Sequence, residues 1–329
     1  MDIQSIEKVE LHQHVDGSIP VGLTWDLMRK NNLAPVDSLE EMRKLLVVQD
    51  EDAGEGLLVY LKKFHYPLWV TQFYDNLLQV AYAIAKEAYA NNVKLLELRY
   101  SPTIHTYAGL TPRQAIVAVL SGLNKAEAEC PGLETGLIII AMRHMGGHIA
   151  KIVARQAIAE SQVLHRRAGV IGFDIAGAER GNPPRLFKGA YTIARKGGLG
   201  LTAHAGEDDG PRVIWEAIDE LGCTRIGHGC SSIDDPELLR RMAKDKILVE
   251  VCQTSNYQTG AVKKGQVHPV LKFLEYGIPI AICTDNTTVS NTNQNKENAL
   301  LQASLTAVGY DNDIAEIHRL AKAHTFISR

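Results

Sequence analysis

The sequence is poor in the features that mark several specialised classes of protein. It has only five cysteines, an odd number with no Cys-x-x-Cys pair, which argues against a disulfide scaffold and a thiolate zinc knuckle. No uncharged run approaches the roughly 18 residues of a membrane helix, and no basic segment with an apolar run opens the chain. Lysine and arginine number 35 against 38 for aspartate and glutamate, so the basic excess of a nucleic-acid binder is absent. We therefore expect a cytoplasmic protein that acts on a small molecule, with no membrane and no nucleic-acid partner.

A regular alternation of β-rich and amphipathic segments is present instead. β-rich runs are expected as strands at residues 9–14, 94–100, 136–142, 170–176, 200–204, 225–228, 247–251 and 278–284. Amphipathic stretches with helical spacing lie between most of them, at residues 112–129, 149–165, 184–196, 210–221 and 236–244. This alternation predicts parallel βαβ units, and eight such units predict an α/β fold of the TIM (β/α)8 barrel type. A doubly wound open sheet is the alternative architecture.

The interval between the first two expected strands, residues 15–93, is much longer than the others and indicates extra helices inserted after the first strand. Within it, Leu57, Tyr60, Leu61 and Phe64 recur on one face at helical spacing. Such a face can simply pack on the barrel, but an insertion after a barrel strand emerges at the active-site end, so we expect a pocket wall or lid. No linker or repeat divides the chain, and one domain over residues 1–329 is predicted.

Polar clusters follow several of the expected strands at their carboxyl ends, where barrel enzymes place catalytic groups. The clusters lie at residues 12–14, 204–207, 225–229 and 283–286. In an extended strand His12 and His14 point to the same side, so both can contact one metal ion. Each cluster alone has a plain structural alternative, such as a hydrogen-bonded core histidine or a solvated loop carboxylate. Their joint placement at one mouth of a barrel favours a catalytic site.

A series of short motifs runs through nearly the whole chain in a specific order. They read ELHQHVDGS at residues 10–18, ELRYSP at 97–102, DIAG at 174–177, HAGE at 204–207, RIGHG at 225–229, VC at 251–252 with SN at 255–256, and TD at 284–285. This series resembles the adenosine deaminase family of the metal-dependent amidohydrolase superfamily. The resemblance implies hydrolytic deamination of adenosine and 2'-deoxyadenosine to inosine and 2'-deoxyinosine, with release of ammonia.

The resemblance also implies one zinc ion per subunit, with His12, His14, His204 and Asp285 as ligands. The chemistry of these residues agrees, because three imidazoles and one carboxylate suit zinc better than calcium or magnesium. By the same match, Glu207 protonates purine N1 while a zinc-activated water attacks C6, and His228 orients or deprotonates that water.

Substrate contacts follow from the resemblance as well. Gly177 matches the position whose backbone N–H meets purine N3, and glycine permits that close approach. Asp16 matches the position that, with its neighbourhood, holds the ribose 5'-hydroxyl, and His14 beside it is also expected to contact substrate. A turn residue before a glycine is the alternative interpretation of Asp16. Asn286 matches the position that contacts purine N7, and its amide donates a hydrogen bond without titrating.

Three departures from the family pattern affect the expected substrate and leave the expected zinc ligands, Glu207 and His228 unchanged. Asn286 stands where animal members carry an aspartate, Ala178 replaces a common aspartate, and Gln253 replaces a proline. The alternative function is therefore deamination of another 6-aminopurine, such as aminodeoxyfutalosine, adenine or a modified adenosine.

Two further alternatives belong to other classes of function. A non-catalytic purine binder would be expected to lose a ligand or the acid, and all of these residues are present. A two-metal hydrolase would be expected to carry a lysine after the fourth strand, where the sequence reads Gly-Phe-Asp at residues 172–174. The oligomeric state is not predicted.

Overall fold

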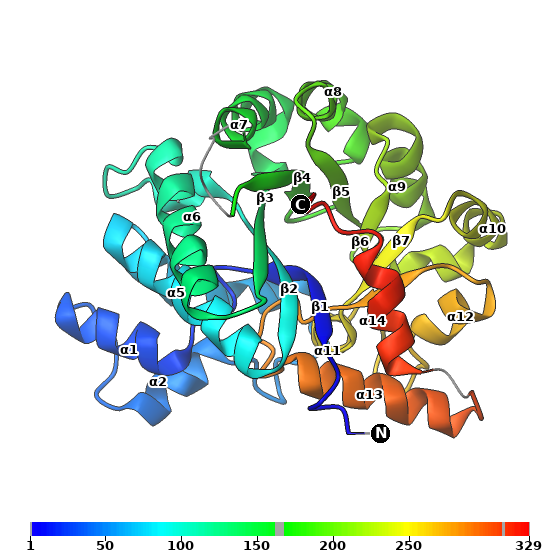
Figure 1. Ribbon diagram of the computed structural model, residues 1–329, viewed down its shortest axis with the longest axis horizontal. Coiled ribbons are helices and arrows are strands. Elements are labelled where there is room, and N and C mark those ends of the chain that lie inside the picture. Colours follow the sequence, from blue (N-terminus) through cyan, green and yellow to red (C-terminus); the bar gives the residue numbers. More distant parts are fainter. Residues whose placement is uncertain (1, 162–167, 311–312, 329) are drawn as a thin grey trace.

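Eight parallel strands form a closed barrel in the computed structural model, which describes residues 2–161, 168–310 and 313–328 (Figure 1). The strands pair in sequence order, and β1 meets β8 at the mouth, where the Asp285 N–H donates to the His12 carbonyl at 2.9 Å. The expected TIM barrel is therefore confirmed. The strands are β1 (Lys8–His14), β2 (Val93–Tyr100), β3 (Glu134–Met142), β4 (Val170–Ala176), β5 (Gly200–Ala205), β6 (Arg225–His228), β7 (Leu248–Val251) and β8 (Ile280–Ile282).

Helices surround the barrel and bury the outer face of its strands (Figure 1). The outer helices are α5 (Tyr74–Ala90), α6 (Pro112–Glu129), α7 (Gly146–Ser161), α8 (Lys188–Lys196), α9 (Pro211–Glu216), α10 (Pro236–Asp245), α12 (Val270–Glu275), α13 (Gln294–Ala307) and α14 (Ile314–Lys322). Helix α6 begins with a capping box, in which Thr111 and Gln114 satisfy each other's backbone N–H groups behind Pro112. None of the described helices is both long and apolar enough to cross a membrane.

The long interval after β1 contains the inserted helices α1 (Val21–Lys30), α2 (Leu39–Leu46), α3 (Leu57–Tyr60) and α4 (His65–Val70), as expected. A short helix α11 (Gln253–Gln258) follows β7. The segment around residues 57–70 is not one regular helix, because a 3-10 turn at Leu61–Phe64 separates α3 from α4. Pro67 lacks the N–H that an α-helix would donate to the carbonyl of Lys63, which favours this break.

Some expected boundaries differ from those of the structure. Strand β8 is shorter than residues 278–284, and residues 162–165 of the expected helix 149–165 lie outside the described part of the chain. The stretch 184–196 begins with a 3-10 turn at Pro184–Phe187, and α9 continues as a π-helical segment at Ala217–Leu221.

The C-terminal segment closes the amino-terminal end of the barrel, and the C label lies near the middle of the barrel in Figure 1. The Phe326 ring occupies the space beside Gly200, where a Cβ atom would lie 2.2 Å from the Phe326 Cγ. The Arg225 guanidinium lies 3.9 Å from the centroid of the same ring. Glycine at position 200 therefore leaves the space that Phe326 needs, and we call this C-terminal segment, residues 324–328, the plug of the barrel.

Candidate active site

The predicted site residues meet at the carboxyl end of the barrel. His12 and His14 end β1, His204 lies on β5, and His228 ends β6. Asp285 follows β8 and pairs with β1 through Gln13. All of these except His12, which is buried behind them, border a cavity of about 470 Å³, which the predicted residues Asp16, Gly177, Glu207 and Asn286 also line.

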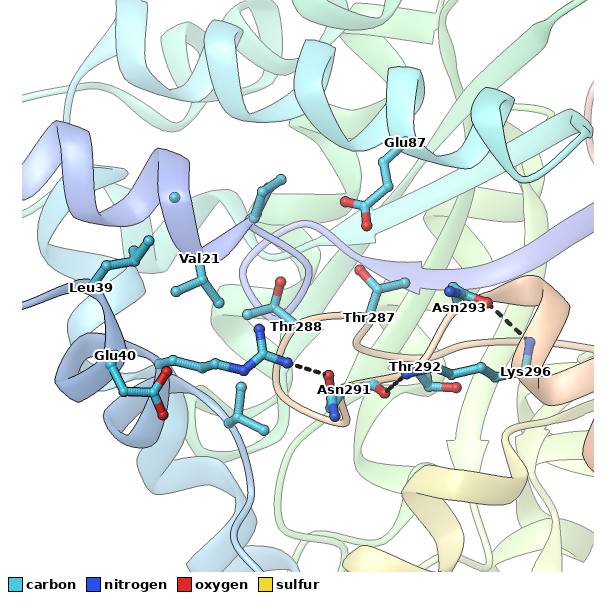
Figure 2. A pocket seen from close by; sticks show the side chains of 14 residues that line it. Val21, Leu39, Glu40, Glu87, Thr287, Thr288, Asn291, Thr292, Asn293 and Lys296 are labelled. Carbon is cyan, nitrogen blue, oxygen red and sulfur yellow. Dashed lines mark hydrogen bonds between the residues drawn. The ribbon is translucent and has the colours of Figure 1, made fainter.

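A second cavity of about 780 Å³ lies between α1, α2 and the loop after β8 (Figure 2). Its lining includes Arg43, which donates to the Asn291 side chain at 2.8 Å, and Lys296, which donates to the Asn291 carbonyl at 2.8 Å. It shares no described lining residue with the cavity at the barrel mouth and contains no histidine. The site chemistry therefore belongs to the barrel mouth.

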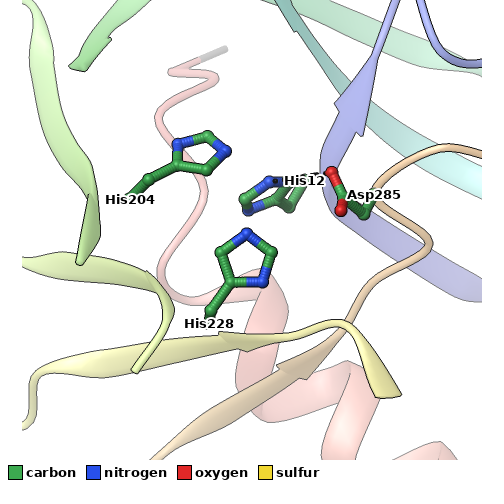
Figure 3. Close-up of side chains that lie close together, drawn as sticks. All are labelled: His12, His204, His228 and Asp285. Carbon is green, nitrogen blue, oxygen red and sulfur yellow. Dashed lines mark ion pairs between the residues drawn. The ribbon is translucent and has the colours of Figure 1, made fainter. Parts of the chain in front are cut away.

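Imidazoles and a carboxylate converge there in two overlapping groups. His12, His204, His228 and Asp285 offer ligand atoms that all lie within 4.8 Å of one another (Figure 3). His14 is closer still, because its Nε2 lies 3.3 Å from His12 Nε2, 3.1 Å from His204 Nε2 and 3.2 Å from Asp285 Oδ1. Both groups share His12, His204 and Asp285.

The group with His14 has the dimensions of a tetrahedral metal site. Four ligand atoms at 2.0–2.1 Å from a zinc ion lie about 3.3 Å apart in a regular tetrahedron. The distances given above, together with 3.5 Å between His12 Nε2 and Asp285 Oδ1, agree with that value. Burial lowers the pKa of His14 and of His204, which keeps these rings neutral as metal ligation requires.

Buried carboxylates hold the other nitrogen of two of these histidines. Glu250 Oε2 lies 2.7 Å from His12 Nδ1, and Asp174 Oδ2 lies 2.9 Å from His204 Nδ1. With Nδ1 facing a carboxylate, each ring turns its Nε2 toward the centre of the site. These pairs fix both ring orientation and ligand basicity.

Two fully buried arginines neutralise the carboxylates below the site. Arg99 contacts Asp174 and Glu250 at 2.9 Å each, and Arg225 contacts Glu250 and Glu97 at 2.7 Å each. Burial alone would raise the pKa of Glu250, but Arg99 and Arg225 reverse this effect and leave the pKa well below its ordinary value. Glu250 is therefore ionised.

Glu207 lines the cavity and, unlike Glu250, has no arginine partner among the described residues. Burial, followed by the charges of Asp285 and Glu179, raises the pKa of Glu207 well above its ordinary value. Its Oε2 lies 3.7 Å from His228 Nε2, beyond hydrogen-bond distance. A carboxyl group with a raised pKa holds its proton more readily and can act as a general acid.

Glu179 holds the loop that carries Glu207. This residue is 1% exposed, and its carboxylate accepts hydrogen bonds from the backbone N–H groups of Gly206, Glu207, Asp208 and Asp209 at 3.0–3.4 Å. Four consecutive N–H groups that point at one carboxylate fix the course of the loop.

Two of the residues expected to contact substrate carry buried polar atoms without partners. Asp16 and Asn286 are buried, and Oδ1 of each has no hydrogen-bond partner in the described residues. Gly17 leaves room for Asn286, because a Cβ at this position would lie 1.7 Å from Asn286 Oδ1. Gly177 has a φ of 96°, a conformation that glycine adopts without strain.

The rest of the cavity wall is mainly apolar. Leu57, Tyr60, Leu61 and Phe64, which the sequence places on one helical face, all line it. The inserted helices therefore form a wall of the pocket, as expected. Among the described lining residues there is no lysine or arginine.

Three supporting residues have no role among the sequence-based predictions. Glu250 contacts His12, Ser255 donates to Asp285 Oδ2 at 2.5 Å, and Asn256 contacts His228 Nδ1 at 2.9 Å. The signal for Glu250 is a lone carboxylate in the apolar strand β7, since a buried charge requires a partner.

Comparisons with known proteins agree with this geometry. Residues 7–329 match the family model described as adenosine deaminase. An adenosine deaminase of Enterococcus faecalis is 35% identical over 99% of this chain and 94% of that protein. A probable adenosine deaminase of Dictyostelium discoideum is 35% identical over 88% of this chain, which spans only 36% of that relative's length. The solved structure of an adenine deaminase from Arthrobacter aurescens has a TM-score of 0.86 at 25% identity, over 98% of this chain and 95% of that one. The chain belongs to the adenosine deaminase family.

Proposed function

We propose that the protein hydrolyses adenosine and 2'-deoxyadenosine to inosine and 2'-deoxyinosine with release of ammonia. The observation that carries this proposal is the convergence of three imidazole Nε2 atoms and Asp285 Oδ1 within 3.1–3.5 Å contacts. The Glu207 carboxyl group, whose pKa is raised by burial, lines the same cavity. Together they supply a metal site and an acid, which are the groups that addition of water to C6 requires.

The proposed metal is one zinc ion per subunit, held by His12, His14, His204 and Asp285. The donor set and its spacing fit a tetrahedral nitrogen and oxygen site. Such a site supplies a water whose pKa is lowered to about 7 in other zinc enzymes. Glu250 and Asp174 orient the ligand rings, and Ser255 fixes Asp285 through its Oδ2.

Glu207 acts as the general acid in this proposal. As water adds to C6, the C6 carbon becomes tetrahedral and ring nitrogen N1 must take a proton, which the Glu207 carboxyl group gives. The Glu179 carboxylate holds the Glu207 backbone in place during this transfer. The exocyclic amine then takes the proton that the attacking water lost and leaves as ammonia, while the new C6 hydroxyl returns a proton to Glu207 and becomes the 6-oxo group.

An uncharged nucleoside fits the cavity better than a nucleotide. A buried phosphate requires cationic or N–H partners, and the described wall offers no lysine or arginine while Asp16 adds a carboxyl group. We propose that Asp16 contacts the ribose 5'-hydroxyl, Gly177 purine N3 and Asn286 purine N7. The alternative substrate is another 6-aminopurine, such as aminodeoxyfutalosine or adenine.

The protein is further proposed to work as one domain in the cytoplasm. All five cysteines are buried free thiols, in keeping with a reducing compartment. No membrane or nucleic-acid partner enters the proposal.

A substrate panel tests the function. Metal-replete protein is incubated with adenosine, 2'-deoxyadenosine, adenine, AMP and aminodeoxyfutalosine, and the ultraviolet shift from 6-aminopurine to 6-oxopurine is followed. Adenosine and 2'-deoxyadenosine are expected to react fastest, and His12→Ala is expected to lose both metal and activity. Turnover of AMP above that of adenosine would refute the assignment of a nucleoside substrate. No turnover of any compound would refute the proposed function and favour a non-catalytic purine binder.

A further inference from the structure

A relay of buried hydrogen bonds runs from the Val270 backbone through His268 and Asn256 to His228. It begins at the Val270 backbone N–H, which lies 3.1 Å from His268 Nδ1. His268 Nε2 lies 3.0 Å from Asn256 Oδ1, and Asn256 Nδ2 lies 2.9 Å from His228 Nδ1. The three side chains are 3% exposed or less.

The direction of every bond in this relay follows from its first member. A backbone N–H can only donate, so His268 Nδ1 accepts and carries no proton. Burial lowers the pKa of His268 to about 3, which keeps the ring neutral with its proton on Nε2. His268 Nε2–H then donates to the Asn256 carbonyl oxygen, and the Asn256 NH2 group must donate to His228 Nδ1.

We propose that Asn256 and His268 are positioning residues that fix His228 as the tautomer with its proton on Nε2. In a neutral imidazole one nitrogen donates and the other accepts, so His228 presents a hydrogen-bond donor to the cavity. If the proposed function holds, this tautomer makes His228 a hydrogen-bond donor to the oxygen of the attacking water, and His228 is not the base that deprotonates the water. His228 keeps its Nε2 proton throughout. The proton that the water loses goes to the Asp285 carboxylate, because Glu207 already carries the proton that N1 receives.

The relay also distinguishes the two overlapping groups at the metal site. A metal ligand must offer a lone pair, and His228 Nε2 has none while it carries a proton. His14 Nε2, by contrast, lies 3.1–3.3 Å from the Nε2 atoms of His12 and His204. The fourth ligand is therefore His14.

The substitution Asn256→Asp distinguishes between His228 as a hydrogen-bond donor and His228 as a base, because the two roles predict opposite effects on kcat. Aspartate has nearly the same shape but offers only acceptor oxygens, so it would draw the His228 proton to Nδ1 and leave Nε2 bare. This is the arrangement that orients a histidine base in serine hydrolases. If His228 is a donor, kcat falls at least tenfold with metal content unchanged; if it is a base, kcat is maintained or rises.

The chain offers a matched control. The Val9 N–H donates to His318 Nδ1 at 3.2 Å, and His318 Nε2 lies 2.8 Å from Asn298 Oδ1, outside the lining of the cavity. Asn298→Asp therefore makes the same chemical change in the same kind of buried relay. Its kcat for adenosine is expected to stay within threefold of the wild-type value.

The tautomer itself is measured by two-bond proton–nitrogen NMR spectra of protein labelled with ¹⁵N-histidine, with the His228 signals assigned from their loss in His228→Gln. The proposal expects an Nε2–H ring in the wild type and an Nδ1–H ring in Asn256→Asp. An Nδ1–H ring in the wild type, or an Asn256→Asp enzyme with undiminished kcat, overturns it. The spectra need no substrate, so inactivity on adenosine would refute the proposed function and leave the relay standing.

Discussion

Replacing Glu250 with glutamine removes a negative charge that joins two buried arginines to a histidine of the site. The carboxylate is fully buried and lies 2.7 Å from His12 Nδ1, 2.7 Å from Arg225 Nε and 2.9 Å from an Arg99 nitrogen. Glutamine keeps the shape but offers one acceptor and places an NH2 group against other donors. We expect both the stability and the metal affinity of the protein to fall.

The loss of stability follows from the two arginines. Removing one partner of a buried ion pair costs about 3–5 kcal/mol, because the other charge stays buried. Arg99 retains Asp174 and Arg225 retains Glu97, so we expect the lower end, about 3 kcal/mol. An unfolding entropy of roughly 2.1 cal/mol/K per residue gives about 0.7 kcal/mol/K for 329 residues, so Tm should fall by about 4 °C.

Metal affinity should fall by about 10–100-fold, as for other residues that orient a ligand histidine. Thermal melts of metal-free protein measure the first effect, and competition with a chelator measures the second. Glu220→Gln is the control, since it breaks the exposed pair of Glu220 with Lys188 and should leave both values unchanged. A Glu250→Gln protein with wild-type Tm and wild-type metal affinity would show that the buried network does not support the site.

Three further predictions concern the acid, the substrate contact and the pH dependence of stability. Glu207→Gln should retain the metal yet lose about 10²–10⁴-fold in kcat, and nearly full activity would exclude it as the acid. Asn286→Ala should lower kcat/KM for adenosine by about fivefold or more, the value of one hydrogen bond, and a change under about threefold would contradict the N7 contact. Burial raises the pKa of Glu297 to about 7, so the folded protein binds more protons than the unfolded chain between the two pKa values. Stability should therefore fall as pH rises from about 4.5 to 7, by roughly 3 kcal/mol in total, and denaturant titrations of Glu297→Gln should lose this slope.

Much of the fold follows from the sequence because strand and helix alternation is a local signal. The run 170–176 is predicted with the same limits as β4, and residues 112–129 with the same limits as α6, where Pro112 and Thr111 fix the start. The end of β8 is not predicted, because Cys283 and Thr284 continue the apolar run although strand pairing stops at Ile282. Where pairing stops depends on the neighbouring strand, which local sequence does not encode.

The sequence predicts some residues of the site better than others. His12 and His14 are brought together by one strand, whereas Glu250 reaches His12 from β7, 238 residues along the chain. Such a contact depends on the register of the closed barrel. The family motif contains Asn256, but its task appears only when His268, which lies outside every motif, is placed beside it.

The plug at the bottom of the barrel has a practical consequence for anyone who alters this protein. Glu97 accepts hydrogen bonds from Thr325 Oγ1 at 2.6 Å and from the Phe326 N–H at 2.7 Å, and it also pairs with Arg225. Arg225 pairs with Glu250, which in turn holds His12. A purification tag, a fusion partner or a truncation at residues 324–328 would therefore disturb an ion-pair chain that ends at the metal site. An enzyme preparation modified at the carboxyl end should therefore be checked for metal content before its activity is interpreted.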